Sequence, residues 1–161
     1  MNQQTEESKV NVEVTLALKL LRALAALLMA VYSALLFYWM FVGFGRSVVH
    51  NGGYHYNVIP FHTIKLYFNH ADHFRLHVWL VNIIGNIAVF VPFGAAAVML
   101  PRVTLSRFLS VFVPAIAIVE LMQLVLKRGS FDVDDIILNT FGALIGYILF
   151  RHIGKMKFAN E

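Results

Sequence analysis

ALAALLMAVYSALLFYWMFVGF, residues 23–44, is a run of 22 residues without a charged side chain. At about 1.5 Å per residue, a helix of this length crosses the roughly 30 Å hydrocarbon core of a bilayer. A removed signal peptide would have a shorter apolar stretch and small residues at its cleavage site, a pattern that residues 42–46 match poorly. We therefore predict that this stretch is an uncleaved membrane-spanning helix.

Further apolar runs follow at residues 78–100, 108–126 and 136–150. The last is shorter than the roughly 17 residues that a span needs, so we expect its helix to begin at Asp132. The chain is 59% hydrophobic and 14% charged, against about 25% charged in an average globular domain. The sequence thus predicts an all-α integral membrane protein, a single domain (residues 1–161) and a four-transmembrane-helix bundle with helices at about 23–44, 78–100, 108–126 and 132–150.

The segments between the predicted helices set the orientation. Eight Lys and Arg residues fall on the side of the two termini and five on the other side, which places the termini in the cytoplasm. We expect residues 1–22 to be a polar tail, mobile over its first 15 residues, and residues 151–161 a basic tail. The long loop, residues 45–75, is then extracytoplasmic, and the helical spacing of Phe61, Ile64, Phe68 and Ala71 favours an interfacial helix within it.

Several function classes are excluded by what the chain lacks. It has no cysteine, which removes thiolate nucleophiles, disulfides and cysteine metal sites. Its net charge is +4, yet no basic cluster typical of nucleic-acid binding occurs, so we expect no nucleic-acid partner. No common catalytic or nucleotide-binding motif is present either, and we predict no cofactor.

Polar residues inside the predicted spans require a partner, a cavity or a function. Asn82 and Asn86 are spaced i,i+4 on the second helix, and Glu120 and Gln123 i,i+3 on the third. One interpretation is hydrogen bonding between helices, typically worth about 1 kcal/mol or less for each contact. The other is a functional site, which is the stronger alternative for the carboxyl group of Glu120.

One face of the fourth helix carries Asp132, Asp135, Asn139, Gly142 and Gly146. The two glycines form a GxxxG spacing that favours close helix packing and allows a homo-oligomer. Acidic groups also cap helix N-termini, but three aspartates exceed what a cap requires. We predict no bound metal; a hard cation held by Asp132, Asp134 and Asp135 is an alternative, as is zinc held by His70, His73 and His77 on one helical face.

Four segments in order resemble the VanZ-like family: YNVIPFHTI (56–64), NIIGNIAVFVPFG (82–94), ELMQ (120–123) and SFDVDDIILNTFGALIGY (130–147). The resemblance implies a small four-helix bacterial cell-membrane protein, and the founding member is associated with resistance to the lipoglycopeptide teicoplanin. Many relatives read Gly-Arg-Ser before the Phe-Asp pair, whereas this chain reads Arg128-Gly129-Ser130. The family positions transfer to Asn57, Pro60, Phe61, Asn86, Pro92, Gly94, Glu120, Gln123, Asp132, Asp135, Asn139 and Gly142.

On the predicted topology, these residues and the polar residues of the spans meet at the external face and form one pocket. We expect its binding residues to be Asn57, Thr63, Asn82, Asn86, Glu120, Gln123, Arg128, Asp132, Asp134, Asp135 and Asn139.

Two functions fit such a pocket. The first is binding or sequestration of an amphiphile at the outer leaflet, with membrane lipids and a lipoglycopeptide antibiotic or a lipid-linked cell-wall component as partners. The second is an intramembrane enzyme that modifies a lipid headgroup or envelope component, with Glu120 as general base and Asp132 and Asp135 placing a metal or hydroxyl. We favour the first function, because it needs no catalyst, and keep the enzyme as the alternative.

Overall fold

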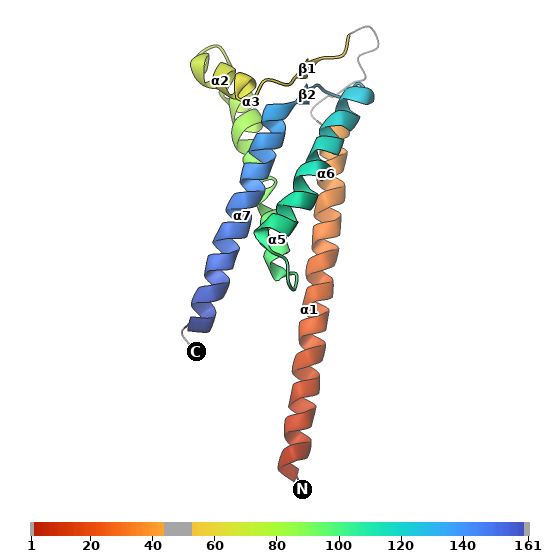
Figure 1. Ribbon diagram of the computed structural model, residues 1–161. Coiled ribbons are helices and arrows are strands. Elements are labelled where there is room, and N and C mark those ends of the chain that lie inside the picture. Colours follow the sequence, from red (N-terminus) through yellow and green to blue (C-terminus); the bar gives the residue numbers. More distant parts are fainter. Residues whose placement is uncertain (1, 44–52, 160–161) are drawn as a thin grey trace. The chain divides into compact units, whose positions relative to one another are not determined.

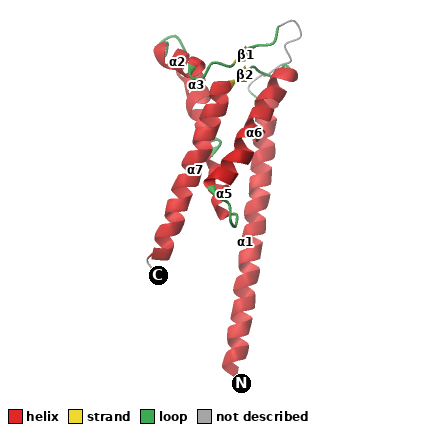
Figure 2. Ribbon diagram, viewed as in Figure 1, coloured by secondary structure: helices red, strands yellow, loops and turns green. Residues whose placement is uncertain are grey.

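The computed structural model describes residues 2–43 and 53–159, most of them helical (Figures 1 and 2). The elements are α1 (Asn2–Phe41), β1 (Tyr56–Asn57), α2 (His62–Asn69), α3 (Leu76–Leu80), the π-helical turn η1 (Val81–Gly85), α4 (Asn86–Ala88), α5 (Val91–Met99), α6 (Leu105–Val125), β2 (Phe131–Asp132) and α7 (Val133–Ala159). Two compact units divide the chain. The first ends at Phe37 and contains most of α1, and the second begins at Tyr38 and includes the last four residues of α1.

Within the described residues, four stretches are long and apolar enough to cross a membrane: Val12–Phe41, Leu76–Met99, Leu105–Val125 and Val133–Ile153. The predicted all-α fold with four spanning helices is confirmed. The structure differs from the prediction at the helix ends, because α1 already begins at Asn2 and α7 continues to Ala159. The segments expected to be polar tails are thus helical, since Glu, Lys and Gln are good helix formers and residues 2–22 contain no Gly or Pro.

The third span begins earlier than its apolar run because a polar residue caps it. Thr104 precedes α6 in an extended conformation, and its side-chain Oγ1 accepts a hydrogen bond from the backbone N–H of Arg107 at 3.3 Å. Threonine is a favoured residue at this position, since its oxygen satisfies one of the free N–H groups of the first turn. The helix therefore starts at Leu105, three residues before the predicted boundary at residue 108.

The second span is an interrupted helix. α3, η1 and α4 follow one another directly, and a turn at Val89 and Phe90 separates them from α5. Pro92 stands in the first turn of α5 and has no N–H to donate, so the preceding helix cannot continue through it.

The second span packs on α7 through glycines. Most contacts of α5 and α4 are with α7. A Cβ atom at Gly142 would overlap the backbone carbonyl of Ile87, one at Gly146 that of Val91, and one at Gly94 that of Ala143. In this chain, the GxxxG face on which we expected self-association is therefore covered by the second span.

The segment before α2 is tied to the start of α7 by a short parallel β-pair. Tyr56 lies opposite Phe131, and Asn57 lies opposite Asp132. The described part of the segment between α1 and α3, residues 53–75, contains β1 and α2, and residues 44–52 lie outside the described structure. The pairing brings β1, α2 and the beginning of α7 to the same end of the second unit (Figure 1).

Candidate functional site

Asp132 lies at the junction of β1, α2 and α7. Its Oδ1 accepts hydrogen bonds from the Asn57 side-chain amide at 3.0 Å and from the Asp134 backbone N–H at 2.8 Å. Its Oδ2 accepts a hydrogen bond from the Thr63 hydroxyl at 2.6 Å. The register of the β-pair produces this meeting, because it sets Asn57 directly opposite Asp132. Asp132 thus caps α7 and also holds β1 and α2.

Asp134 is completely buried and serves as an anchor for α2. Its two carboxylate oxygens accept hydrogen bonds from the backbone N–H groups of Phe61 and Ile64, at the beginning of α2. A carboxylate is favourable there, because the first N–H groups of a helix lack partners within the helix and carry partial positive charge. Phe61 has a φ of 64°, a left-handed conformation that costs on the order of 1–3 kcal/mol for a residue other than glycine. Its N–H bond to Asp134 stabilises this turn.

Asp135 joins α7 to the second span. Its Oδ1 accepts a hydrogen bond from the Asn86 side-chain amide at 2.6 Å. Asn82, one turn earlier, donates instead to the backbone carbonyl of Val78 at 2.8 Å. Of the two asparagines, Asn86 therefore makes the expected hydrogen bond between helices, and Asn82 bonds within its own helix.

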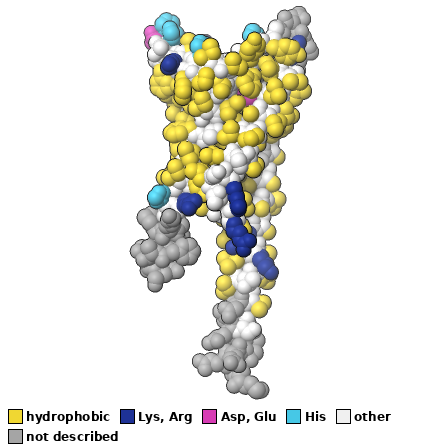
Figure 3. All heavy atoms as spheres, in the orientation of Figure 1, with side chains coloured by type: hydrophobic (Ala, Val, Ile, Leu, Met, Phe, Trp, Pro, Cys, Tyr) yellow, Lys and Arg dark blue, Asp and Glu magenta, His cyan; other side chains and the backbone are white. Residues whose placement is uncertain are grey.

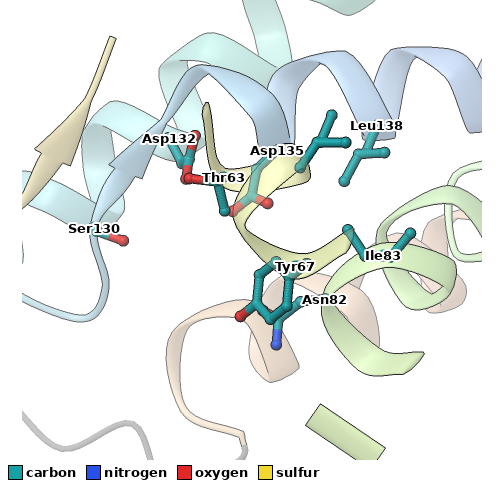
Figure 4. Close-up of a pocket in the computed structure, with 9 residues that line it drawn as sticks. Thr63, Tyr67, Asn82, Ile83, Ser130, Asp132, Asp135 and Leu138 are labelled. Carbon is teal, nitrogen blue, oxygen red and sulfur yellow. The ribbon is translucent and has the colours of Figure 1, made fainter. Parts of the chain in front are cut away.

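A pocket of about 130 Å³ lies between α2, the second span and the start of α7 (Figure 4). Figure 4 shows Asp132, Thr63 and Asp135 close together on one side, with Tyr67 and Asn82 facing them. The lining combines carboxylates, hydroxyls and an amide with an apolar wall, and it contains no Lys, Arg or His. Its residues are Thr63, Ile64, Tyr67, Asn82, Ile83, Ser130, Asp132, Asp135 and Leu138.

The size of the pocket limits what it can hold. A water molecule occupies about 30 Å³ in the liquid, and a cavity of about 150 Å³ accommodates benzene. A volume of about 130 Å³ therefore suits one small group of a larger molecule, such as a headgroup fragment or part of one sugar ring. Carboxylate oxygens accept hydrogen bonds from hydroxyl or ammonium groups, so the lining favours a group that carries such donors.

Tyr67 is a pocket residue that the sequence interpretation missed. Burial raises the pKa of its hydroxyl, and the negative charges of Asp135 and Asp132 raise this pKa further. The i,i+4 spacing of Thr63 and Tyr67 places both on one helical face and could have identified it. Of the apolar residues expected to share one face of an interfacial helix, Ile64 lines the pocket, whereas Phe61 and Phe68 are 51% and 57% exposed.

Seven of the predicted binding residues do not line this pocket: Asn57, Asn86, Glu120, Gln123, Arg128, Asp134 and Asn139. Glu120, Gln123 and Asn139 are instead buried within α6 and α7. The Gln123 amide donates to the backbone carbonyl of Met40 at 3.1 Å, and the Arg128 guanidinium donates to that of Phe41 at 3.4 Å. This pocket therefore brings together only Thr63, Asn82, Asp132 and Asp135 of the predicted set, and Gln123 and Arg128 bond instead to the end of α1.

Neither hypothesised metal-ligand set is brought together as a site. Across residues 2–43 and 53–159, no group of three or more His, Asp or Glu side chains is arranged to hold a metal ion. Asp132 and Asp134 already accept hydrogen bonds from N–H and O–H groups of the chain. Of the three histidines, His73 contacts Asp72 at 2.9 Å, and its ring lies against that of His70.

The four apolar spans in the described part of the chain define a multi-pass membrane protein, and a small polar pocket lies at the beginning of its last span. The family model described as VanZ/LLP1 matches residues 24–154, which is most of the chain, so the protein belongs to this family. This confirms the resemblance found in its motifs. No curated protein and no solved structure matches the chain.

Proposed function

We propose that this protein gives a bacterium resistance to lipoglycopeptide antibiotics such as teicoplanin by binding an amphiphile at the outer leaflet of the cell membrane. The ligand is the antibiotic itself or a lipid-linked cell-wall component. A donor-bearing polar group enters the pocket, and the acyl chain lies along the exposed apolar side chains of α2 and the second span, among them Phe68 and Leu80. Membership of a family commonly linked to glycopeptide resistance supports the proposal.

The observation that carries this proposal is the composition of the pocket. Binding sites for organic ligands combine an apolar wall with a few converging polar groups. Here the wall includes Ile64, Ile83 and Leu138, and the polar groups include the carboxylates of Asp132 and Asp135. The pocket is too small for a whole antibiotic and fits recognition of one part of it, while the membrane accommodates the rest.

Filling the pocket is expected to abolish resistance. In Ser130→Trp the indole occupies the pocket from its rim, because Ser130 is an exposed residue of the lining. The control is Ser106→Trp, which makes the same change at an exposed position of α6 outside the lining. We expect a teicoplanin-susceptible host with Ser130→Trp to be as sensitive as the host alone, and Ser106→Trp to stay resistant at equal membrane levels. Equal resistance in both variants would show that this pocket is not the site on which resistance depends.

Asp135→Asn separates binding from catalysis in the same assay. The amide keeps an oxygen that can accept the Asn86 hydrogen bond, so a binding site is weakened only in part. An amide cannot transfer protons, so an activity that needs the carboxylate as acid or base is lost completely. The second function, an enzyme that uses Glu120, Asp132 and Asp135, predicts complete loss of resistance. Asp135→Asn also removes a negative charge that raises the pKa of Tyr67, so this pKa is expected to move down toward its ordinary value. An absorbance titration of the folded variant measures the shift, and the same titration with Tyr67→Phe identifies the signal of Tyr67.

We further propose that both termini are cytoplasmic and that the pocket faces the outside of the cell. The distribution of Lys and Arg supports this orientation. The chain has no cysteine, so single cysteines report without background. A cysteine at Gly129 is expected to react with an impermeant thiol reagent on intact cells, and one at Ala159 only after lysis. The reverse labelling pattern would contradict the topology.

A further inference from the structure

Three exposed arginines gather at the end of α7 away from the pocket. Arg102 lies in the turn between α5 and α6, Arg107 lies in the first turn of α6, and Arg151 lies on α7, about 24 Å along the helix from Asp135. We call Arg102, Arg107 and Arg151 the arginine cluster. Figure 3 shows basic side chains at the border of the hydrophobic surface, at the end where the α5–α6 turn lies.

Tyr147 fixes Arg151 in place. The Tyr147 side chain is 2% exposed, and its hydroxyl donates to the backbone carbonyl of Val103 at 3.2 Å. Its ring stacks on Phe108, with centroids 5.9 Å apart. The Arg151 guanidinium then donates to the Tyr147 hydroxyl at 2.8 Å and lies 5.8 Å from the ring centroid. Arg151 is thereby held against the α5–α6 turn.

The second guanidinium is oriented by the same turn. Arg107 Nη1 donates to the backbone carbonyl of Arg102 at 3.2 Å. The next residue along the chain is Val103, whose backbone carbonyl accepts the hydrogen bond from the Tyr147 hydroxyl. Backbone carbonyls of one turn therefore position both Arg107 and, through Tyr147, Arg151.

The charge of this cluster is not balanced within the described chain. No Asp or Glu occurs at residues 73–119 or 136–160. No ion pair joins an arginine of the cluster to any residue of the described ranges 2–43 and 53–159. The first turn of α6 contains no acidic residue, so the positive end of its dipole adds to the charge of Arg107. An anion at this place would relieve the repulsion between these groups.

We propose that the arginine cluster binds the headgroup of an anionic phospholipid. Its neighbours Met99 and Leu100 before the turn, and Leu149 and Phe150 before Arg151, are exposed apolar residues that suit acyl chains. The arginines lie at the border of this apolar surface, where headgroup phosphates lie, and the planar guanidinium matches phosphate oxygens in two parallel hydrogen bonds. This site is separate from the pocket and does not depend on the proposed resistance function.

The test is lipid selectivity of the purified full-length protein in mixed micelles. Native mass spectrometry compares retention of phosphatidylglycerol with that of zwitterionic phosphatidylcholine. We expect preferential retention of phosphatidylglycerol, and a decrease in this preference of about five-fold for each arginine removed in Arg107→Gln and Arg151→Gln. Tyr147→Phe keeps every charge but removes the hydroxyl that orients Arg151, so it is expected to reduce the preference in part.

The matched control is Lys65→Gln with Arg75→Gln, which removes the same net charge from exposed positions at the other end. This control is expected to keep the preference of the parent protein. An unchanged preference in the Arg107→Gln/Arg151→Gln double variant would overturn the proposal, as would an equal loss in the control. Excess inorganic phosphate is expected to leave the lipid bound, and its displacement by phosphate would overturn the assignment to a phospholipid.

Discussion

Replacing Gly142 with alanine is expected to destabilise the protein by about 3 kcal/mol or more. The added Cβ would overlap the backbone carbonyl of Ile87, and a backbone atom cannot turn aside as a flexible side chain can. Relief requires α7 and the second span to separate along their whole glycine contact. The measurement is thermal unfolding in detergent followed by circular dichroism, together with the yield of monodisperse protein.

Gly85→Ala is the matched control for this result. A Cβ atom added at Gly85 would have the carbonyl oxygen of Leu80 as its nearest neighbour, at 3.7 Å, which is an ordinary contact. Because alanine is about 1 kcal/mol more favourable than glycine inside a helix, we expect equal or higher stability. If both alanine variants unfold at the temperature of the parent protein, the glycine contact does not hold α7 and the second span together.

Asp134→Ala is expected to release α2 from the start of α7, at a cost of roughly 2–5 kcal/mol. The substitution leaves the N–H groups of Phe61 and Ile64 without the acceptor that both use. Hydrogen exchange followed by mass spectrometry should show faster exchange of the backbone amides in α2, with a lower unfolding temperature.

Asp72→Ala provides the comparison for this variant, because it also removes one carboxylate, from a side chain that is 77% exposed. A surface change of this kind is expected to alter stability by less than about 0.5 kcal/mol. Were α2 to exchange at the same rate in Asp134→Ala and Asp72→Ala, the carboxylate of Asp134 would not be its anchor.

The spans could be predicted from the sequence because a membrane helix requires only a long apolar run, a property of neighbouring residues. That the carboxylates at the start of α7 lie near α2 could be predicted from the sequence only in part. Asn57 and Asp132 are 75 residues apart, and nothing in the sequence indicates a β-pair of two residues that sets them opposite each other. The apolar spacing of Phe61 and Phe68 predicted the existence of α2 but not that Thr63 and Tyr67 line a pocket.

The polar residues Gln123, near the end of α6, and Arg128, just after it, show a different limit. Gln123 and Arg128 were expected to point into a shared pocket, but they donate to the carbonyls of Met40 and Phe41. Every residue has a backbone carbonyl, so its use as an acceptor leaves no trace in the sequence. Side-chain pairs such as Asn86 and Asp135 can be proposed from residue type, whereas a partner in the backbone becomes visible only in the structure.

The pairing of the second span with α7 also sets an order of events during synthesis. Asn86 and its acceptor Asp135 are separated by 49 residues, and all of α6 is made between them. At about 5–20 residues per second, Asn86 precedes its partner by roughly 2–10 s. Throughout that interval the second span, interrupted at Val89 and Phe90, lacks the neighbour that accepts the hydrogen bond of Asn86. The hydrogen bond that joins the second span to α7 therefore cannot form until all of α6 has been made and α7 has begun.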